Sequence, residues 1–309
     1  YSSADQRRSA LVHAFSRNTQ RAQGWNWSEE KKRFVGNPAR SVKLQRYLIN
    51  LYRKKTKDGE FSTSSRGMTA HNMRKIHEMT VRYIQEKNRT NLKGRMNVSD
   101  WGGVFKRMEE QAIGLISFRC LLRTCNVVDL TMDDLDFSPL EGNDTHLGIT
   151  PKSCKTHQMG RQAAFDFYAE TDPDMKAFCV VRCVRAWLIM SKITKGYLFP
   201  KIYGHDQMQS SDEHISKKSY LENFRSALCE IGEPPELYTN QAFRRGGSVF
   251  LLVDRGFKLP DVLRWGKWSV GLKTSTILRY LVADTDLVNI PRRRLMLPAP
   301  AQSQQALQL

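Results

Sequence analysis

Residues 238–280 constrain the fold more than any other stretch, because glycine and proline divide them into short helical segments. Two arginines stand beside two glycines (Arg244–Gly247), and an apolar run follows at Val249–Val253. Gly256 is placed to end this first helix, and Pro260 suits the first turn of the next one. The pattern predicts a succession of short helices in this part of the chain.

The middle of the chain combines helical periodicity with short alternating stretches. Apolar residues recur near the 3.6-residue helical period in the regions 99–128, 176–193 and 218–231. Residues 146–150 and 162–167 are typical of strands and are joined by a basic turn. Residues 131–137 also alternate. We therefore expect a mainly α fold with a small antiparallel β-sheet, which is an α+β class.

The N-terminal third carries most of the positive charge. The chain has 309 residues and a net charge of +18. Residues 1–98 hold 22 Lys and Arg against 7 Asp and Glu, whereas the remaining residues hold 27 against 24. This uneven distribution favours a module that binds a polyanion over a basic face that is merely solvated. We predict an N-terminal arm at 1–35, a basic helical domain at 36–98, a larger domain at 99–290 and a flexible tail at 291–309.

Composition disfavours several kinds of protein. No apolar run approaches the ~20 residues that span a membrane, and the chain opens with no signal-peptide pattern. The six cysteines show no zinc spacing, and the polar loop around residues 205–214 is a poor metal site. We therefore expect an intracellular protein with reduced thiols.

The chain holds the residue types for one kind of phosphate chemistry. Cutting a DNA strand without a metal requires a nucleophile, cations on the non-bridging oxygens, and an acid for the leaving 5′ oxygen. Tyrosine can attack phosphorus and conserve the energy of the phosphodiester bond in a phosphotyrosine. Arginine holds two oxygens with its planar fork, and a lysine in a hairpin turn can give up a proton. In the stretch 238–280, the arginine pair Arg244–Arg245 and Tyr280 are candidates for the first two parts.

The order of these residues resembles that of the tyrosine recombinases, the phage-integrase superfamily. LLRTCNVVDLTMDDLDF is similar to the family's first box, CKTHQMGR to its β-hairpin, and TNQAFRRGG to its second box. GKWS is similar to its His/Trp position and ILRYL to its nucleophile segment. The resemblance covers about residues 110–285 and looks most like the Crypton-type recombinases of eukaryotic transposable elements. It implies a recombinase catalytic fold preceded by a helical core-binding domain.

The resemblance implies a role for each of six residues. These are Arg123 and Arg244 as phosphate clamps, Lys155 as acid, Tyr280 as nucleophile, and Gln241 and Trp268 as assisting groups. Gln241 stands where the family usually has histidine, and it can donate a hydrogen bond but is neither acid nor base. The spacing from Trp268 to Tyr280 is also longer than usual. Both departures motivate a second hypothesis, a domesticated and catalytically inactive DNA-binding protein on the same fold.

Three of the assignments have competitors nearby in the sequence. Lys152 and Arg161 compete with Lys155, Arg245 with Arg244, and Trp265 with Trp268. The predicted DNA contacts are Arg40, Lys43, Arg46, Arg53, Lys54, Arg74, Lys75, Arg82, His157, Arg161 and Arg245. The resemblance implies a nuclear protein that recombines double-stranded DNA as a homo-oligomer, a dimer or tetramer, with no metal or cofactor. An RNA-binding or chromatin scaffold protein is a third hypothesis.

Overall fold

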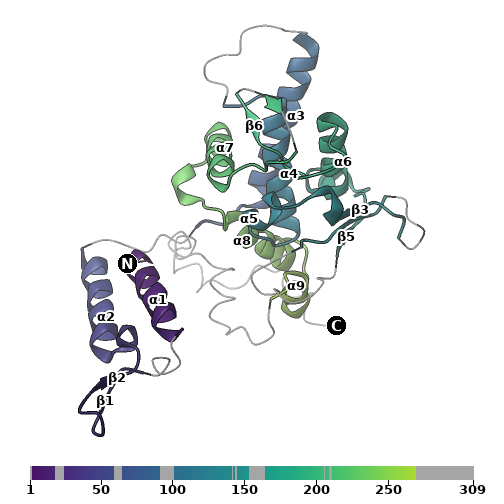
Figure 1. The fold of residues 1–309 in the computed structure, drawn as a ribbon. Helices are drawn as coiled ribbons and strands as arrows, with labels where there is room; N and C mark the ends of the chain where they lie inside the picture. Colours follow the sequence, from purple (N-terminus) through teal and green to yellow (C-terminus); the bar gives the residue numbers. More distant parts are fainter. Residues whose placement is uncertain are drawn as a thin grey trace, which may run out of the picture. The chain divides into compact units, whose positions relative to one another are not determined.

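The computed structural model divides the chain into two compact units that meet between Thr63 and Ser64. It describes residues 2–17, 24–58, 65–90, 101–140, 142, 145–152, 164–204, 206–208 and 211–268. Over these residues the chain is mainly helical with small antiparallel sheets, which confirms the predicted class (Figure 1).

The first unit is a pair of helices joined through a short hairpin. Its elements are α1 (Ser2–Ser16), β1 (Asn26–Ser28), β2 (Arg33–Val35), the 3-10 helix η2 (Pro38–Arg40) and α2 (Val42–Lys57). The strands pair antiparallel, and the rings of Trp25 and Trp27 contact Phe34 at centroid distances of 5.6 and 5.3 Å. The buried Asn37 donates a hydrogen bond to the Val12 carbonyl and accepts one from the Ala39 amide. Residues predicted to be an arm thus pack into the same unit as α2.

Helix α2 buries only a narrow strip of its surface. Leu48 is buried, whereas Val42 and Tyr47, which belong to its apolar periodicity, are each 60% exposed. At about 100° per residue, neither side chain shares the face of Leu48. The helix therefore offers a broad, basic outer face to solvent.

Helix α3 (Ala70–Thr90) belongs to the second unit, although the sequence analysis placed it in the basic domain at 36–98. Its buried Met73 and Ile76 join the core of the second unit, where α3 packs on α4 (Val104–Arg119). The predicted linker up to residue 98 lies outside the described residues. The prediction grouped α3 with the basic domain because of its exposed charges. Exposed charge does not indicate which core the apolar face of a helix packs against.

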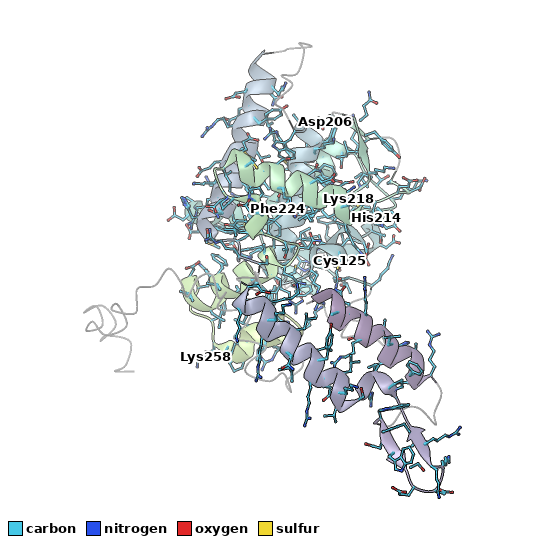
Figure 2. The ribbon with its side chains drawn as sticks, turned by 90° about the vertical axis from the view of Figure 1, so that its left-hand side faces the viewer. Cys125, Asp206, His214, Lys218, Phe224 and Lys258 are labelled. Atoms are coloured by element: carbon cyan, nitrogen blue, oxygen red, sulfur yellow. The ribbon has the colours of Figure 1, made fainter. Side chains whose placement is uncertain are left out.

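Helix α4 runs through the middle of the second unit (Figure 1). It packs against α3, α6 (Val180–Ser191), α7 (Lys217–Glu230) and α8 (Ala242–Val249), and it is buried from Arg107 to Phe118. Phe224 of α7 also lies in this core (Figure 2). At the other end of the core, Phe118, Phe178 and Phe250 form an aromatic cluster. A helix buried on all sides gives the other helices a common support.

A three-stranded antiparallel sheet flanks the helices. Its order is β3 (Leu135–Asp136), β4 (Leu147–Ile149) and β5 (Phe165–Phe167), with β4 in the centre. The two predicted strands are thereby confirmed over their described residues, and the alternating stretch before them supplies the third. Along the chain, α5 (Thr124–Val128) and η3 (Met132–Asp134) connect α4 to β3, and η4 (Pro173–Phe178) follows β5.

The polar loop after α6 holds a small hairpin, β6 (Ile202–Tyr203) with β7 (Gln207–Met208). Asp206 of this hairpin, labelled in Figure 2, accepts hydrogen bonds from the amides of Phe105 and Lys106 at 2.8 and 3.2 Å. It therefore caps the first turn of α4, where the orphan amides need an acceptor.

The stretch with the double glycine forms α8, a π-helical turn η6 (Phe250–Asp254) and α9 (Leu259–Trp265), preceded by η5 (Pro235–Leu237). A Cβ on Gly246 would overlap the Met68 backbone, and one on Gly247 would overlap the Phe118 carbonyl. Only glycine allows α8 to approach both backbones this closely. Gly256 has a φ of 68° and follows η6, as predicted for a helix end. The predicted helix around Tyr280 lies outside the described residues.

Candidate functional site

Arg123 lies in a tight turn between α4 and α5. Leu121 has a φ of 52°, and the Leu122 amide donates to the Ser117 carbonyl at 3.1 Å. Both leucines are buried, and Arg123 follows them in an extended conformation at the N-cap of α5, half-buried. The turn therefore holds the arginine by its backbone, with its neighbours anchored in the core.

Arg244 and Trp268 form a pair. The side chain of Arg244 is 6% exposed on α8, and its Cζ lies 4.6 Å from the centroid of the Trp268 ring. The Trp268 amide donates to the Leu263 carbonyl at 3.0 Å, which fixes the turn after α9. An arginine over the face of an indole makes a favourable cation–π contact and keeps its charge and its planar fork of N–H donors.

Leu121, in the turn that presents Arg123, lies close to two glycines. A Cβ on Gly266 would stand 3.0 Å from the Trp268 ring and 3.2 Å from a Leu121 methyl group. A Cβ on Gly247 of α8 would meet the same leucine at 2.7 Å. Helix α8 and the turn after α9 thus both approach the turn that presents Arg123.

The neighbouring arginine, Arg245, has a different position. It is also 6% exposed, and its Nη1 donates to the Ser65 carbonyl at 2.6 Å. This hydrogen bond ties α8 to the segment before α3. Arg245 therefore acts as a structural link, and Arg244 stays the better candidate for the predicted phosphate contact.

The two tryptophans also separate. The Trp265 indole N–H donates to the Arg119 carbonyl at 2.7 Å, and its ring packs edge-on against Phe165 and Phe167. Trp265 therefore joins α9 to the sheet and to α4. Trp268, which faces Arg244, fits the predicted assisting position better.

Gln241 begins α8 one turn before Arg244. It occupies the N-cap position, and its backbone amide donates to the Thr239 hydroxyl at 3.3 Å. Its side-chain Oε1 is buried and has no hydrogen-bond partner among the described residues. A buried carbonyl oxygen of this kind is costly without a hydrogen-bond donor.

Four predicted site residues, Lys155, His157, Arg161 and Tyr280, lie outside the described residues. A competitor of the first, Lys152, is described. Its Nζ donates to the Thr131 hydroxyl at 2.9 Å and lies 3.5 Å from an Asp133 carboxylate oxygen. Because Lys152 is engaged with η3, Lys155 remains the better candidate for the acid.

The predicted DNA contacts divide between the units. On the first unit, the exposed ones are Arg40, Lys43, Arg46, Arg53 and Lys54. On α3 of the second unit, Arg74 and Arg82 are exposed and Lys75 is half-buried. Arg74 additionally lies over the Phe178 ring, with its Cζ 5.1 Å from the centroid. The outer face of α2 is therefore the densest basic surface among these residues.

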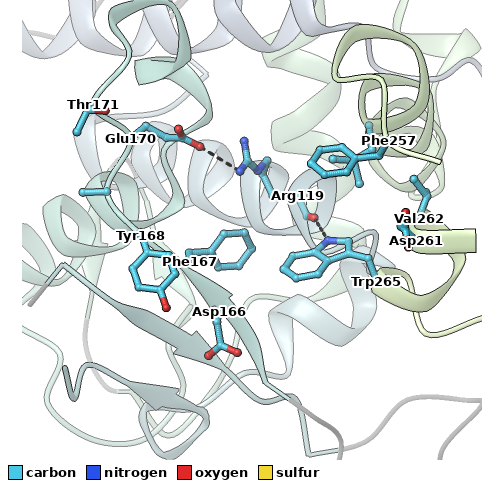
Figure 3. Close-up of a pocket in the computed structure, with 12 residues that line it drawn as sticks. Arg119, Asp166, Phe167, Tyr168, Glu170, Thr171, Phe257, Asp261, Val262 and Trp265 are labelled. Atoms are coloured by element: carbon cyan, nitrogen blue, oxygen red, sulfur yellow. Dashed lines mark hydrogen bonds and ion pairs between the residues drawn. The ribbon is translucent and has the colours of Figure 1, made fainter. Parts of the chain in front are cut away.

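A pocket of about 470 Å³ lies beside Trp265, between the end of β5 and the segments η6 and α9 (Figure 3). Phe167, Leu251 and Phe257 supply apolar walls, and the Arg119–Glu170 ion pair, 3.1 Å long, closes one end. The carboxylate neutralises the arginine, so this pocket suits an apolar group and not a phosphate. Sequence reasoning missed it because β5, η6 and α9 build it together.

Buried acids in α4 form a second feature that the sequence did not reveal. Glu109 and Glu110 are 0% and 1% exposed, and burial raises the pKa of both carboxyl groups. For Glu110 the pKa rises to about 8, although nearby Arg107 favours the charged form. Arg107 itself lies between the rings of Tyr83 and Trp101 and pairs with Glu230 at 2.8 Å.

Neither a membrane segment nor a metal centre is apparent in the part of the chain that the structure describes. Its helices lack the combination of length and apolarity that crossing a bilayer requires. Its His, Cys, Asp and Glu side chains form no group of three or more that could hold a metal ion.

Comparison with known proteins gives distant structural similarity. No protein-family model matches the chain, and no curated protein matches it. The fold is similar to that of the XerH site-specific recombinase bound to palindromic difH substrate in a post-cleavage complex, at 12% identity and a TM-score of 0.45. It is also similar to XerH bound to difH substrate in a pre-cleavage complex, at 13% identity and a TM-score of 0.49.

These matches cover 74% and 92% of this chain but only 52% and 64% of the recombinase chains. The chain therefore spans less than two thirds of the length of each recombinase it matches. At these identities and scores the similarity does not assign the chain to a family.

Proposed function

We propose that the chain breaks and rejoins DNA strands as a tyrosine recombinase does, through a 3′-phosphotyrosine. One observation supports this most: Arg244 contacts Trp268, and the segments that carry them come close to Leu121, in the turn that presents Arg123. Arg123, Arg244 and Trp268 come from separate segments and were selected by their resemblance to one family's motifs.

The mechanism follows from the chemistry of each group. Arg123 and Arg244 donate hydrogen bonds to the non-bridging oxygens of the scissile phosphate and stabilise the charge that develops there. The Tyr280 hydroxyl releases its proton to water as its oxygen attacks phosphorus, a P–O bond to the tyrosine forms, and the bond to the 5′ oxygen breaks. Lys155 gives its proton to that leaving oxygen. Attack by a 5′ hydroxyl on the phosphotyrosine reverses these steps and joins the strand.

Two further residues assist in this proposal. The Gln241 amide, one helical turn from Arg244, lies on the same helical face and can donate to the phosphate. Trp268 orients the Arg244 guanidinium by stacking. Both act on the phosphate or its clamp, and neither needs to exchange a proton.

The basic face of α2 would hold the duplex by its phosphates, largely without regard to sequence. In this proposal the core-binding function of residues 36–98 is shared between the first unit and α3. A homo-oligomer on double-stranded DNA and a nuclear location belong to the same proposal, as does the likeness to Crypton-type recombinases.

The test is capture of the covalent intermediate. A duplex selected by the protein from a random-sequence library is nicked near its centre, so that a short 5′-hydroxyl fragment diffuses away after cleavage. The intact protein should form an adduct that survives denaturation and disappears on proteolysis. Tyr280→Phe should form none, and an adduct with this variant would disprove the assignment of the nucleophile.

The inactive DNA-binding protein remains the second candidate. Gln241, in place of an acid–base residue, is the observation that favours it. That hypothesis predicts tight binding to the selected duplex with no adduct from the intact protein. Gln241→His would then be informative, because gain of an adduct would show a site that lacks one group only.

A further inference from the structure

A histidine at the edge of the three-stranded sheet makes a bridge that the proposed mechanism does not use. His146 immediately precedes β4, and its side chain is 4% exposed. Its Nδ1 lies 2.7 Å from the Ser138 carbonyl oxygen, beyond β3. Its Nε2 lies 2.9 Å from the Asp166 Oδ1, on β5. One ring therefore contacts β5 and the segment that follows β3.

The two contacts require two protons on the ring. A backbone carbonyl is only an acceptor, so Nδ1 must carry a hydrogen. A neutral imidazole has a single N–H, and Nε2 would then direct a lone pair at a carboxylate oxygen. A second proton on Nε2 converts this repulsion into a charge-assisted hydrogen bond. The geometry therefore favours the imidazolium form of His146.

The charges around the ring agree with this assignment. In the described part of the chain, the titratable groups that face it are Asp136 on β3, and Asp166 and Tyr168 on and after β5. Burial of the ring disfavours its charge, but the hydrogen bonds to Asp166 and Ser138 and the two carboxylate charges outweigh burial. Together they raise the pKa of His146 above its ordinary value of about 6.5.

A glycine makes room for the bridge. Gly148 of β4 pairs with Asp136 on one side and Asp166 on the other. A Cβ there would stand 3.4 Å from both the His146 Cε1 and the Asp136 Cβ. The imidazole thus lies over a position without a side chain, between two carboxylates in one row across the sheet. Figure 3 shows Asp166 leaving β5 on the side opposite Phe167.

We propose that His146 is a positioning residue, which as an imidazolium ties β4 and β5 to the segment after β3 and so steadies the two strands between which Lys155 lies in the sequence. This inference rests on the proposed function, because it assigns the bridge to the delivery of the proton to the leaving oxygen. Lys155 lies in sequence between β4 and β5, the two strands that the His146–Asp166 contact joins. Small displacements of a proton donor are costly, since a shift of about 1 Å can reduce a rate by about 10²-fold.

Two variants and a control test the role through the leaving group. His146→Gln removes the imidazolium, and Asp166→Asn removes its counter-charge from a side chain that is 42% exposed. His214→Gln is the matched control, because the His214 Nδ1 also lies 2.7 Å from a backbone carbonyl, on another part of the unit. Thermal unfolding of each protein establishes that it is folded before its rate is measured.

Each protein is then assayed on two nicked duplexes, one with the ordinary 5′ oxygen and one with a 5′ sulfur at the scissile position. A thiolate leaves without protonation, so the sulfur duplex does not need the acid. His146→Gln and Asp166→Asn should slow cleavage of the oxygen duplex by roughly 10-fold to 100-fold. They should leave the sulfur duplex nearly unchanged, and His214→Gln should affect neither. Equal slowing of both duplexes by His146→Gln, or no slowing, overturns the inference.

Lys155→Ala separates failure of this inference from failure of the proposed function. If the intact protein forms no adduct with either duplex, the proposed function fails and the positioning role fails with it. If Lys155→Ala shows the oxygen–sulfur difference and His146→Gln does not, only the His146 inference fails.

Titration by NMR adds a readout that does not depend on cleavage. The ring carbon and nitrogen shifts of His146 should report a pKa above about 6.5 in the intact protein. Asp166→Asn should lower this pKa, because the variant loses one of the carboxylates that favour the charged ring. A His146 that titrates below its ordinary value would contradict the imidazolium bridge.

Discussion

The two units of this chain place their charges in opposite ways. In the first unit, the basic residues of α2 that the sequence predicted as DNA contacts are exposed, and Leu48 is the only buried residue of that helix in the described set. The second unit buries Arg107, Arg244 and Arg245, each at 6% exposure or less. Exposed charge is screened by salt and costs little, whereas buried charge is expensive and must be held in a fixed geometry.

This difference suggests a division of work. A screened basic face suits attraction of a polyanion over many phosphates. Buried arginines held by rings and carbonyls suit stabilisation of one phosphate in one geometry. We therefore expect substitutions of the buried arginines of the second unit to change chemistry or folding, and substitutions on the outer face of α2 to change affinity.

The largest expected effect is at Arg244. Arg244→Lys keeps the charge but loses the planar fork, so cleavage on the nicked duplex should fall by about 10²–10³-fold while duplex binding is retained. The measurement is the single-turnover rate of adduct formation. Arg245→Lys is the matched control, and a greater loss of cleavage rate there would reverse the assignment of the clamp.

A second prediction concerns the close approach of α8 to α4. Gly247→Ala should lower the free energy of unfolding of the second unit by about 1–3 kcal/mol or more, because the added Cβ would overlap the Phe118 carbonyl. Gly24→Ala, in the first unit, meets its nearest atom at an ordinary 3.5 Å and serves as the control. Calorimetry should show one transition moved by Gly247→Ala and neither moved by Gly24→Ala.

The pH dependence of stability should differ between the units. Burial raises the pKa of Glu110 from 4.5 to about 8 in the folded chain. The contribution of this group to stability is full below the unfolded pKa, and it is lost as pH rises towards 8, because the unfolded chain gives up the proton first. Stability of the second unit should therefore fall between about pH 4.5 and pH 8. Glu110→Gln should flatten this decline in urea titrations.

Glu222→Gln is the control for that experiment, because the Glu222 side chain is 61% exposed on α7. It should leave the pH profile as it is in the intact protein. A Glu110→Gln profile as steep as that of the intact protein would show that other groups cause the decline.

The smallest expected effect is on the outer face of α2. Arg46→Ala and Arg53→Ala should each weaken binding to cognate and random duplexes alike, and each should reduce the slope of log affinity against log salt by about 1. Fluorescence anisotropy over a range of salt concentrations measures both. Gln45→Ala, an exposed neutral position on the same helix, should leave the slope unchanged.

Features of the fold that depend on residues close together in the sequence could be predicted, whereas features that depend on distant residues could not. Gly256 and Pro260 act on their own backbone, so the helix boundaries around them were predictable. The strands around β4 and β5 were likewise predictable from alternation. The turn that holds Arg123 was selected by resemblance, and its geometry depends on Leu121 adopting a positive φ that no local pattern announces.

Features built from distant segments were not predictable. The hairpin of β1 and β2 was not predicted, because strands of three residues leave too little alternation to detect. Asp206 caps a helix that begins 102 residues earlier. The bridge at His146 needs two partners on two other segments, and a single histidine before an apolar run carries no signal of them.

The double glycine of α8 has a further consequence for anyone who wishes to redesign this protein. Because Gly246 and Gly247 allow backbone to meet backbone, no side chain is available there to repack after a neighbouring substitution. The backbone of α8, which carries Arg244, is thus held directly against the backbones of Met68 and Phe118. Changes in affinity are better sought on the face of α2 that is exposed within its own unit, where side chains can be changed without repacking a backbone contact.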